Sequence, residues 1–262
     1  MPAIERPGGI TIAWDEVGSG PTVVFADQPF SPPDIYEALR TDLARDHRLV
    51  SYDMRGMGAS TREGPYNLET DVDDLVAVLE AIGGADVLIG FSDGCHRAVK
   101  AAARRSELTA AVISPAGNPL GRDILATDGL AASDGVVDAL QQMLKTDYRA
   151  ALRTMITSIN PEMDIDEVRD RIDRTIEYAP QEQAAARFQE WVMAEAREEA
   201  LALGDRLWLI ISPNVFFRGT IAAPTRELLP EANVLEVDEG AISAPQHTTK
   251  VVRELTKTRS RA

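Results

Sequence analysis

The sequence contains very little cysteine and histidine. Cys95 is the only cysteine among 262 residues, and the histidines are His47, His96 and His247. A single thiol excludes disulfides within the chain, and a metal site built from cysteine or histidine is not expected. No apolar run approaches the ~18 residues of a membrane helix, and the N-terminal residues lack the apolar core of a signal peptide. We therefore expect a cytoplasmic protein without a metal ion or a membrane anchor.

Positive charge is also scarce, since 27 Lys and Arg stand against 42 Asp and Glu, for a formal net charge of -15. Phosphate backbones would be repelled, so nucleic acid is not an expected partner. A hydrophobic share of 44% allows a sizeable core. No cofactor motif occurs, so we expect no cofactor and a small-molecule substrate. The oligomeric state stays open, with a homodimer as one option.

Short apolar runs alternate with segments of helical periodicity. Strands are expected at 10–14, 22–26, 48–52, 85–89, 108–113, 207–211 and 234–237. Helices are expected at 34–45, 68–82 with Asn67 as cap, 96–105 and 248–255. This alternation predicts an α/β fold with a mainly parallel, doubly wound sheet.

The segment 118–203 differs because it contains no strand-like run and is rich in Ala, Glu, Arg, Gln and Met. At least four helices fit it, at 136–144, 147–159, 165–177 and 181–203. We therefore predict a core domain formed by residues 1–117 and 204–262, with 118–203 inserted as an all-helical cap.

One motif carries chemistry. Gly90-Phe91-Ser92-Asp93-Gly94 fits the pattern G-x-S-x-G and lies between an apolar strand and a helix. In that setting the serine occupies a tight, strained turn, and the two glycines let strand and helix approach closely. Its hydroxyl then projects above the carboxyl end of the sheet, and the Asp93 N–H faces the same space.

On this motif the chain resembles the α/β-hydrolase fold family, and the resemblance covers most of its length. Residues 9–24 look like the opening hairpin of the family, and 53–60 are similar to its D-x-R-G-x-G-x-S turn. The helical segment resembles the cap of the family. The resemblance implies that Asp53 and Arg55 fix a structural turn as an ion pair and take no part in catalysis.

The family also implies a second oxyanion donor, a general base and an acid that orients the base. The donor follows the strand 22–26, where Asp27-Gln28 replaces a His-Gly pair and Pro29 occupies the donor position. Proline has no N–H to donate. A shift in register would make the Gln28 N–H the donor instead.

The acid should follow the strand 207–211, where no carboxylate occurs and Asn214 is the candidate to orient an imidazole. The base should follow the last strand, where Ser243 aligns with the expected histidine. His247 lies four residues later. Two interpretations are open for it: a base that reaches Ser92 through a rearranged loop, or a surface or capping histidine.

His96 is the second candidate base, four residues after Ser92. A packed histidine beneath the cap or against the sheet is the favoured interpretation, because geometry decides the reach of a base. Its position near a helix N-terminus would lower its pKa and keep it neutral. His47 is expected in an exposed loop, and Cys95 is expected to be a small buried apolar residue.

Asp27 and Asp93 are expected to form an acidic mouth at the site. A neighbouring like charge raises the pKa of a carboxyl group, and an acid held protonated could donate a hydrogen bond or a proton. Trp191 is a candidate for lining the substrate pocket, although aromatic residues at helical spacing are more often plain core.

Three functions fit these residues. The first is hydrolysis of a small ester, thioester or lactone through Ser92, with His247 as base and Asn214 as its orienting group. The second is a non-hydrolytic lyase, cyclase or isomerase of natural-product metabolism, in which Asp27, Ser92, Asp93 and His96 orient the substrate and move protons. The third is a binding protein that has kept the pocket and lost catalysis.

Overall fold

A computed structural model describes residues 1–27, 30, 32–121, 124, 135–212, 221–238 and 245–259. Eight strands in this part of the chain form one sheet in the order β1-β2-β4-β3-β5-β6-β7-β8. The strands are β1 (Ala3–Arg6), β2 (Ile10–Gly18), β3 (Thr22–Ala26), β4 (Arg48–Tyr52), β5 (Ala85–Gly90), β6 (Thr109–Pro115), β7 (Leu207–Ile211) and β8 (Asn233–Glu236). β2 pairs antiparallel with β1 and β4, and the other pairs are parallel. The predicted mainly parallel sheet is confirmed.

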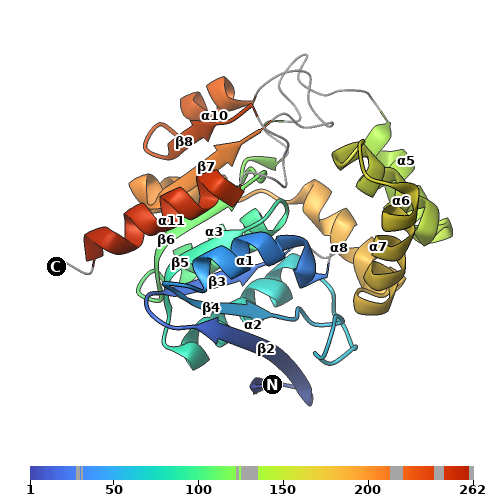
Figure 1. Cartoon of the computed structure of the whole chain (residues 1–262), viewed down its shortest axis with the longest axis horizontal. Coiled ribbons are helices and arrows are strands. Elements are labelled where there is room, and N and C mark those ends of the chain that lie inside the picture. The colour runs from blue at the N-terminus through green and yellow to red at the C-terminus, as the bar shows by residue number, and fades with distance from the viewer. Residues whose placement is uncertain are drawn as a thin grey trace.

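Helices cover both faces of this sheet (Figure 1). The helices outside the insertion are the 3-10 turn η1 (Pro33–Tyr36), α1 (Glu37–Leu43), α2 (Leu68–Ile82), α3 (Gly94–Arg104), α10 (Ala222–Leu228) and α11 (Pro245–Arg259). Apolar residues of α2 and α3 pack on one face, and those of α1 and α11 pack on the other.

The strand β3 shows why a continuous apolar run predicts a strand that is buried on both faces. Val24 and Ala26 point into the core beneath α2 and α3, whereas Val23 and Phe25 point into the core beneath α1 and α11. All four side chains are fully buried. A strand in the middle of a doubly covered sheet has no solvent face, so alternation of apolar and polar residues disappears.

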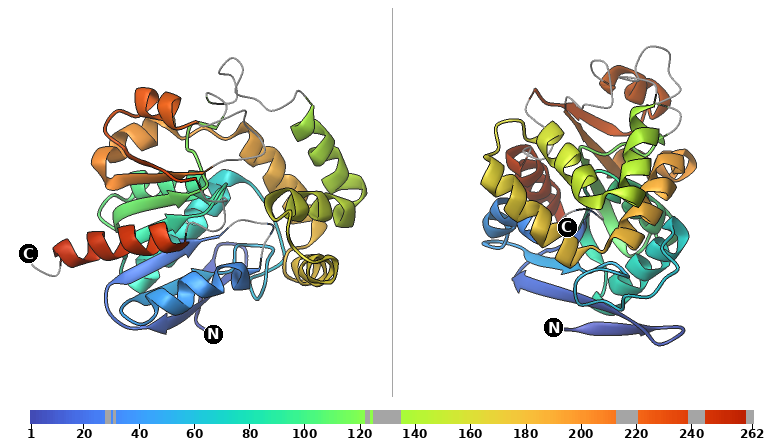
Figure 2. Two further views of the ribbon diagram at one scale, coloured as in Figure 1. Left: turned by 45° about the horizontal axis from the view of Figure 1, so that its top comes forward. Right: turned by 90° about the vertical axis from the view of Figure 1, so that its right-hand side faces the viewer.

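A helical insertion follows β6 and lies beside the carboxyl ends of the central strands (Figure 2). Its described helices are α5 (Val136–Thr146), α6 (Tyr148–Ile159), α7 (Ile165–Tyr178), α8 (Gln181–Met193) and α9 (Arg197–Leu203), and the 3-10 turn η2 (Gly204–Arg206) leads into β7. The first four pack around a core of their own, and Phe30 from the loop after β3 joins it, with its ring 5.9 Å from that of Phe188. The α/β fold with a helical insertion is thus confirmed.

The helix boundaries follow local chemistry where that chemistry is strong. Asn67 caps α2, and its side chain accepts a hydrogen bond of 2.9 Å from the Thr70 N–H, as predicted. Gly83 ends α2 in the left-handed conformation. The helix expected at 181–203 is instead two helices, α8 and α9, separated by a short break at 194–196.

The expected opening hairpin at 9–24 is wrong. β2 pairs with β1 on one side and with β4 on the other, so β4 lies between β2 and β3. β1 is an edge strand of only four residues and α10 is a seven-residue helix, and neither was expected from the sequence. No helix in the described ranges has both the length and the apolar character that a bilayer crossing requires.

Candidate active site

The segment Gly90-Phe91-Ser92-Asp93-Gly94 forms a sharp bend between β5 and α3, which we call the elbow. Ser92 has φ 51, a left-handed conformation that is uncommon for a residue other than glycine. The Ser92 N–H donates to the Pro115 carbonyl oxygen at 3.1 Å, and the Gly94 N–H donates to the Phe91 carbonyl oxygen at 2.7 Å. The strained bend that the motif predicts is present, and the Ser92 side chain is half-buried.

The two glycines of the bend are required by packing. A Cβ atom on Gly94 would lie 2.1 Å from the Ala26 carbonyl oxygen, and one on Gly90 would lie 2.6 Å from the Gly94 carbonyl oxygen. These obstacles are backbone atoms, which cannot rotate away as a side chain can. Both positions therefore exclude every residue except glycine, whatever chemistry takes place at Ser92.

Asp93 lies beside the serine and forms a buried ion pair. Its Oδ2 accepts a hydrogen bond of 2.9 Å from Nη1 of Arg97, one helical turn later in α3. Burial raises the pKa of Asp93, and the Arg97 guanidinium opposes that rise. The Asp93 N–H is the expected oxyanion donor, because it follows the serine at the start of α3.

Arg97 also holds the loop after β3. Its Nη2 donates to the Asp27 carbonyl oxygen, so one guanidinium contacts both Asp93 and Asp27, the first residue of the segment where the second oxyanion donor is expected. The sequence interpretation missed this arginine. The four-residue spacing of Asp93 and Arg97 on one helix was the signal that could have found it.

The Asp27 side chain is buried, and its Oδ1 has no hydrogen-bond partner among the described residues. Burial raises its pKa to about 7, while Arg40 and Arg97 act in the opposite direction. The expected acidic pair therefore also contains a positive charge, because Arg97 bonds the Asp93 carboxylate and the Asp27 carbonyl oxygen. Burial, and not mutual repulsion, is the main cause of their raised pKa values.

His96 is buried, with both ring nitrogens lacking a hydrogen-bond partner among the described residues. Burial lowers its pKa to about 4, Arg97 lowers it further, and the nearby Asp93 carbonyl partly offsets both. The direction of this pKa agrees with the expected neutral imidazole, but desolvation, and not the helix N-terminus, is its leading cause.

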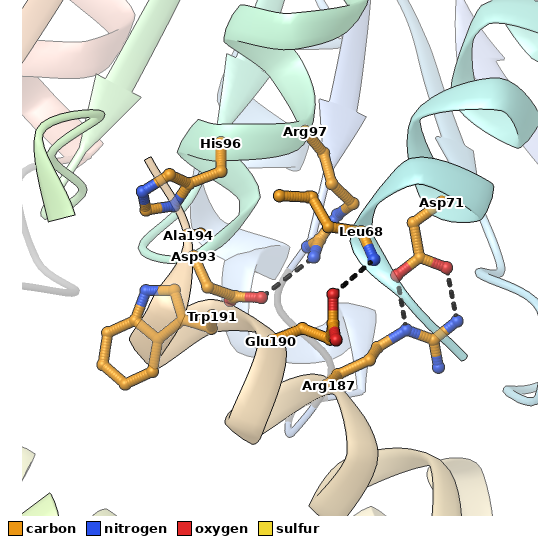
Figure 3. Close-up of a pocket in the computed structure, with 9 residues that line it drawn as sticks. All are labelled: Leu68, Asp71, Asp93, His96, Arg97, Arg187, Glu190, Trp191 and Ala194. Carbon is orange, nitrogen blue, oxygen red and sulfur yellow. Dashed lines mark hydrogen bonds and ion pairs between the residues drawn. The ribbon is translucent and has the colours of Figure 1, made fainter. Parts of the chain in front are cut away.

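A narrow pocket lies beside the elbow, between α2, α3 and α8 (Figure 3). It is lined by Leu68, Asp71, Asp93, His96, Arg97, Arg187, Glu190, Trp191 and Ala194. Its accessible interior is the size of about one water molecule. The pocket brings together three residues that the sequence suggested for substrate binding: Asp93, His96 and Trp191.

Arg187 attaches the insertion to the sheet domain through a guanidinium whose three nitrogens all donate hydrogen bonds. Its Nε and Nη2 bind the two carboxylate oxygens of Asp71 at 2.7 and 2.6 Å. Nη2 also donates to the Arg55 carbonyl oxygen at 2.7 Å, and Nη1 donates to Gln183. We call the Arg187–Asp71 pair the clamp. Nothing in the sequence pointed to it, because 116 residues separate its members.

The D-x-R-G turn is structural, but its contacts differ from those expected. Arg55 pairs with Asp74 of α2 through two hydrogen bonds of 3.0 Å and does not pair with Asp53. Asp53 instead accepts hydrogen bonds from the Ala59 N–H at 2.8 Å and from the Tyr178 hydroxyl at 2.6 Å. Tyr178 belongs to α7, so this turn also anchors the insertion.

The expected base and acid are placed as follows. His247 is the third residue of α11, is partly exposed, and makes no hydrogen bond with any described residue. Asn214, Gln28 and Pro29 lie outside the described residues. The catalytic role of His247 and the roles of the other three stay predictions.

The other histidine and the cysteine are now placed. The expectation of an exposed His47 is wrong: its ring is buried between Asp46 Oδ1 at 2.9 Å and the Thr256 hydroxyl at 3.0 Å. Cys95 is fully buried in the core, as expected. Among the described residues no cluster of three or more His, Cys, Asp or Glu side chains is arranged to hold a metal ion.

Comparison with models of protein families matches residues 29–238 to the alpha/beta hydrolase family. The chain belongs to the α/β-hydrolase family. The match covers the nucleophile elbow and the insertion, and the strand order described above is consistent with it.

One curated protein is similar to part of this chain. It is 2-(acetamidomethylene)succinate hydrolase of Mesorhizobium japonicum, 27% identical over 168 residues, which are 63% of this chain and 58% of the relative. The chain therefore matches less than two thirds of that relative's length.

Solved structures share the fold over nearly the whole chain. A bromoperoxidase from Bacillus anthracis has a TM-score of 0.80 at 16% identity, covering 96% of this chain and 97% of its own. The esterase EaEST from Exiguobacterium antarcticum has a TM-score of 0.78 at 18% identity, covering 97% and 98%.

Proposed function

We propose that this protein hydrolyses a small ester, thioester or lactone through Ser92. The geometry of the elbow carries the proposal: a serine in a left-handed bend at the carboxyl end of β5, followed directly by a helix N-terminus. Membership of the α/β-hydrolase family supports it. So do the names of two similar proteins, a succinate-derivative hydrolase and an esterase.

In the proposed reaction, the Ser92 hydroxyl attacks the carbonyl carbon and His247 takes its proton. The Asp93 N–H stabilises the oxyanion. The alcohol or thiol leaves with the proton from His247, and water then cleaves the acyl-enzyme by the same proton transfers in reverse. Asn214 orients His247 as a neutral amide. Losing the charge of a triad acid lowers the rate by about four orders of magnitude in a related case, so slow turnover is expected.

The proposed substrate contacts are Asp27, Gln28, Pro29, Asp93, His96 and Trp191. The buried, pairwise compensated charges at Asp93 suit a small uncharged organic molecule better than an ionic polymer. A small-molecule substrate thus remains the proposed partner, and the cytoplasm the proposed compartment.

Labelling with a fluorophosphonate probe tests the role of Ser92. Rapid covalent labelling of the parent is expected, with complete loss in Ser92→Ala and no change in Ser106→Ala, which alters an exposed serine in the turn after α3. Absence of labelling in the folded parent, or equal labelling of the Ser92 variant, rejects the proposal. His247→Ala is expected to lower the labelling rate at least about a hundredfold. An unchanged rate removes His247 from the mechanism.

One observation favours a non-hydrolytic reaction as the second candidate. Asp27 is a buried carboxyl group whose pKa is raised to about 7, and its Oδ1 has no partner in the described ranges, so it is suited to donate a proton near neutral pH. Such an acid suits an isomerase or a lyase that does not need Ser92 as a nucleophile. Turnover of a candidate metabolite that survives Ser92→Ala but is lost in Asp27→Asn would select this alternative. A ligand that binds without turnover in either variant would point to a binding protein.

A further inference from the structure

The pocket beside the elbow has two distinct ends (Figure 3). At one end lie the rings of His96 and Trp191, with Ala194 between them. At the other end the Asp93–Arg97 and Asp71–Arg187 pairs lie side by side. Each of these pairs is buried and joins one carboxylate to one guanidinium. The charges inside the pocket therefore cancel, and Glu190 at the rim is exposed.

His96 carries two of the buried polar atoms in this pocket that have no hydrogen-bond partner among the described residues, and Arg97 Nε is a third. His96 is 2% exposed, and neither of its ring nitrogens has a partner among the described residues. A neutral imidazole carries one N–H donor and one nitrogen acceptor. Leaving a buried donor and a buried acceptor unpaired is unfavourable. A ligand that supplies a matching acceptor and donor recovers that free energy.

We propose that this pocket is a substrate subsite in which His96 recognises one small neutral group that both donates and accepts hydrogen bonds, a hydroxyl or a primary amide. The subsite deepens the proposed function and rests on it, because Asp93, which lines the pocket, directly follows Ser92 in the chain. A substrate acyl chain bound at Ser92 extends past Asp93, and its polar end enters between His96 and Trp191.

The lining disfavours charged groups. A carboxylate would meet the carboxylates of Asp93 and Asp71, and an ammonium would meet the guanidinium groups of Arg97 and Arg187. In each case the repelling charge is already fixed in an ion pair and cannot turn away. The space, about that of one water molecule, admits only the tip of a substrate chain.

Nitrogen NMR of the histidine side chains tests the subsite without requiring turnover. The chain has three histidines, so a sample with ¹⁵N-labelled histidine gives three imidazoles to follow. His47 serves as an internal control, because both its nitrogens are already bonded to Asp46 and Thr256. His96→Asn assigns the signals of His96.

Titration with acetamide is expected to shift the His96 signals saturably and to leave those of His47 unchanged. Acetate, which is an anion, and acetone, which accepts but does not donate, are expected to shift them at least about tenfold less at equal concentration. No saturable shift with acetamide, or equal shifts with all three probes, overturns the subsite.

A pair of esters tests the same subsite in turnover. The p-nitrophenyl esters of 4-amino-4-oxobutanoic acid and of 4-oxopentanoic acid differ only in an amide or a methyl ketone at the chain end. The parent is expected to prefer the amide ester about tenfold in kcat/KM. His96→Leu is expected to abolish the preference, whereas His96→Asn is expected to retain part of it. Fluorophosphonate labelling of each variant verifies that the elbow is intact.

The two experiments separate two kinds of failure. A saturable acetamide shift without hydrolysis of either ester rejects the proposed hydrolysis and keeps the subsite. Hydrolysis of both esters with no preference and no shift rejects the subsite and keeps the hydrolase.

Discussion

Arg187 and Arg97 are both buried arginines at the boundary between the sheet domain and the insertion, but their surroundings differ. In the clamp, Arg187 binds both oxygens of Asp71, and it also donates to the Arg55 carbonyl oxygen and to Gln183, so each of its three nitrogens has a partner. Arg97 makes a single bond to Asp93 and one to the Asp27 carbonyl, and its Nε has no partner among the described residues.

Two residues near Arg97 also carry buried polar atoms without partners in the described part of the chain, namely Asp27 and His96. We call Asp27, His96 and Arg97 the elbow cluster. Buried polar groups are normally satisfied, and clusters that are not satisfied tend to occur where a protein binds or transforms something. The comparison thus separates a group that holds the insertion in place from one that is suited to chemistry.

Breaking the clamp should have the largest effect. Arg187→Met leaves Asp71 buried without its partner, and the expected loss in free energy of unfolding is about 3–5 kcal/mol. Urea unfolding measures it. Arg149→Met, which removes an exposed pair with Asp173, is the matched control and should cost no more than about 1 kcal/mol. Equal losses in the two variants would contradict the assignment of the clamp as a structural contact.

Asp27 should make stability fall as pH rises. Its pKa lies above the ordinary value of 3.8, at about 7, so its contribution is fully present below pH 3.8 and is lost as pH rises toward 7. The difference between these two pKa values corresponds to about 4 kcal/mol in the free energy of unfolding. Relative to the parent, Asp27→Asn should therefore gain about this much between pH 4 and pH 8 in urea unfolding. A constant difference between the two proteins across this range would show that Asp27 does not titrate there.

His96 should act with the opposite sign. Its pKa is lowered from 6.5 to about 4, so its contribution to stability is present above pH 6.5 and is lost as pH falls toward 4. The difference between these two pKa values corresponds to about 3 kcal/mol in the free energy of unfolding. His96→Asn should thus gain relative to the parent on acidification from pH 7.5 to pH 4. The same variant gaining instead on alkalinisation would place a charged histidine in the pocket.

The smallest expected effect concerns Tyr178, whose hydroxyl links α7 of the insertion to Asp53. Tyr178→Phe removes the hydrogen bond to the Asp53 carboxylate, for an expected loss of about 2 kcal/mol. Thermal and urea unfolding measure it, with fluorophosphonate labelling as the readout of the elbow. An unchanged labelling rate is expected, because the contact belongs to the structural group. A labelling rate that falls together with the free energy of unfolding would show that this contact also affects the elbow.

Most of the sheet could be predicted from the sequence, because its signals are local. β3, β4 and β7 begin and end where their apolar runs do. β1 was missed because its four residues alternate weakly at the sheet edge, with no buried face to reveal them. α10 was missed because Pro224 interrupts its helical pattern.

Contacts between distant segments account for the errors at the site. His47 is followed by a charged residue and reads as a loop position, yet its partner Thr256 lies 209 residues away. Arg55 was paired with the nearest aspartate in sequence, whereas the fold offers it Asp74 of α2. Ser92 was found because a bend needs glycines at fixed spacing. Arg97 bonds a backbone carbonyl 70 residues away, which no local pattern encodes.

The elbow glycines have a consequence for how such chains are recognised. Ala26 forbids a side chain at position 94, and the Gly94 carbonyl forbids one at position 90, for reasons independent of the serine hydroxyl. Selection for a folded sheet alone would keep both glycines in place, even in a protein that had lost catalysis. A sequence search that detects it reports how closely strand and helix approach each other, and the reaction has to be inferred from the neighbouring side chains.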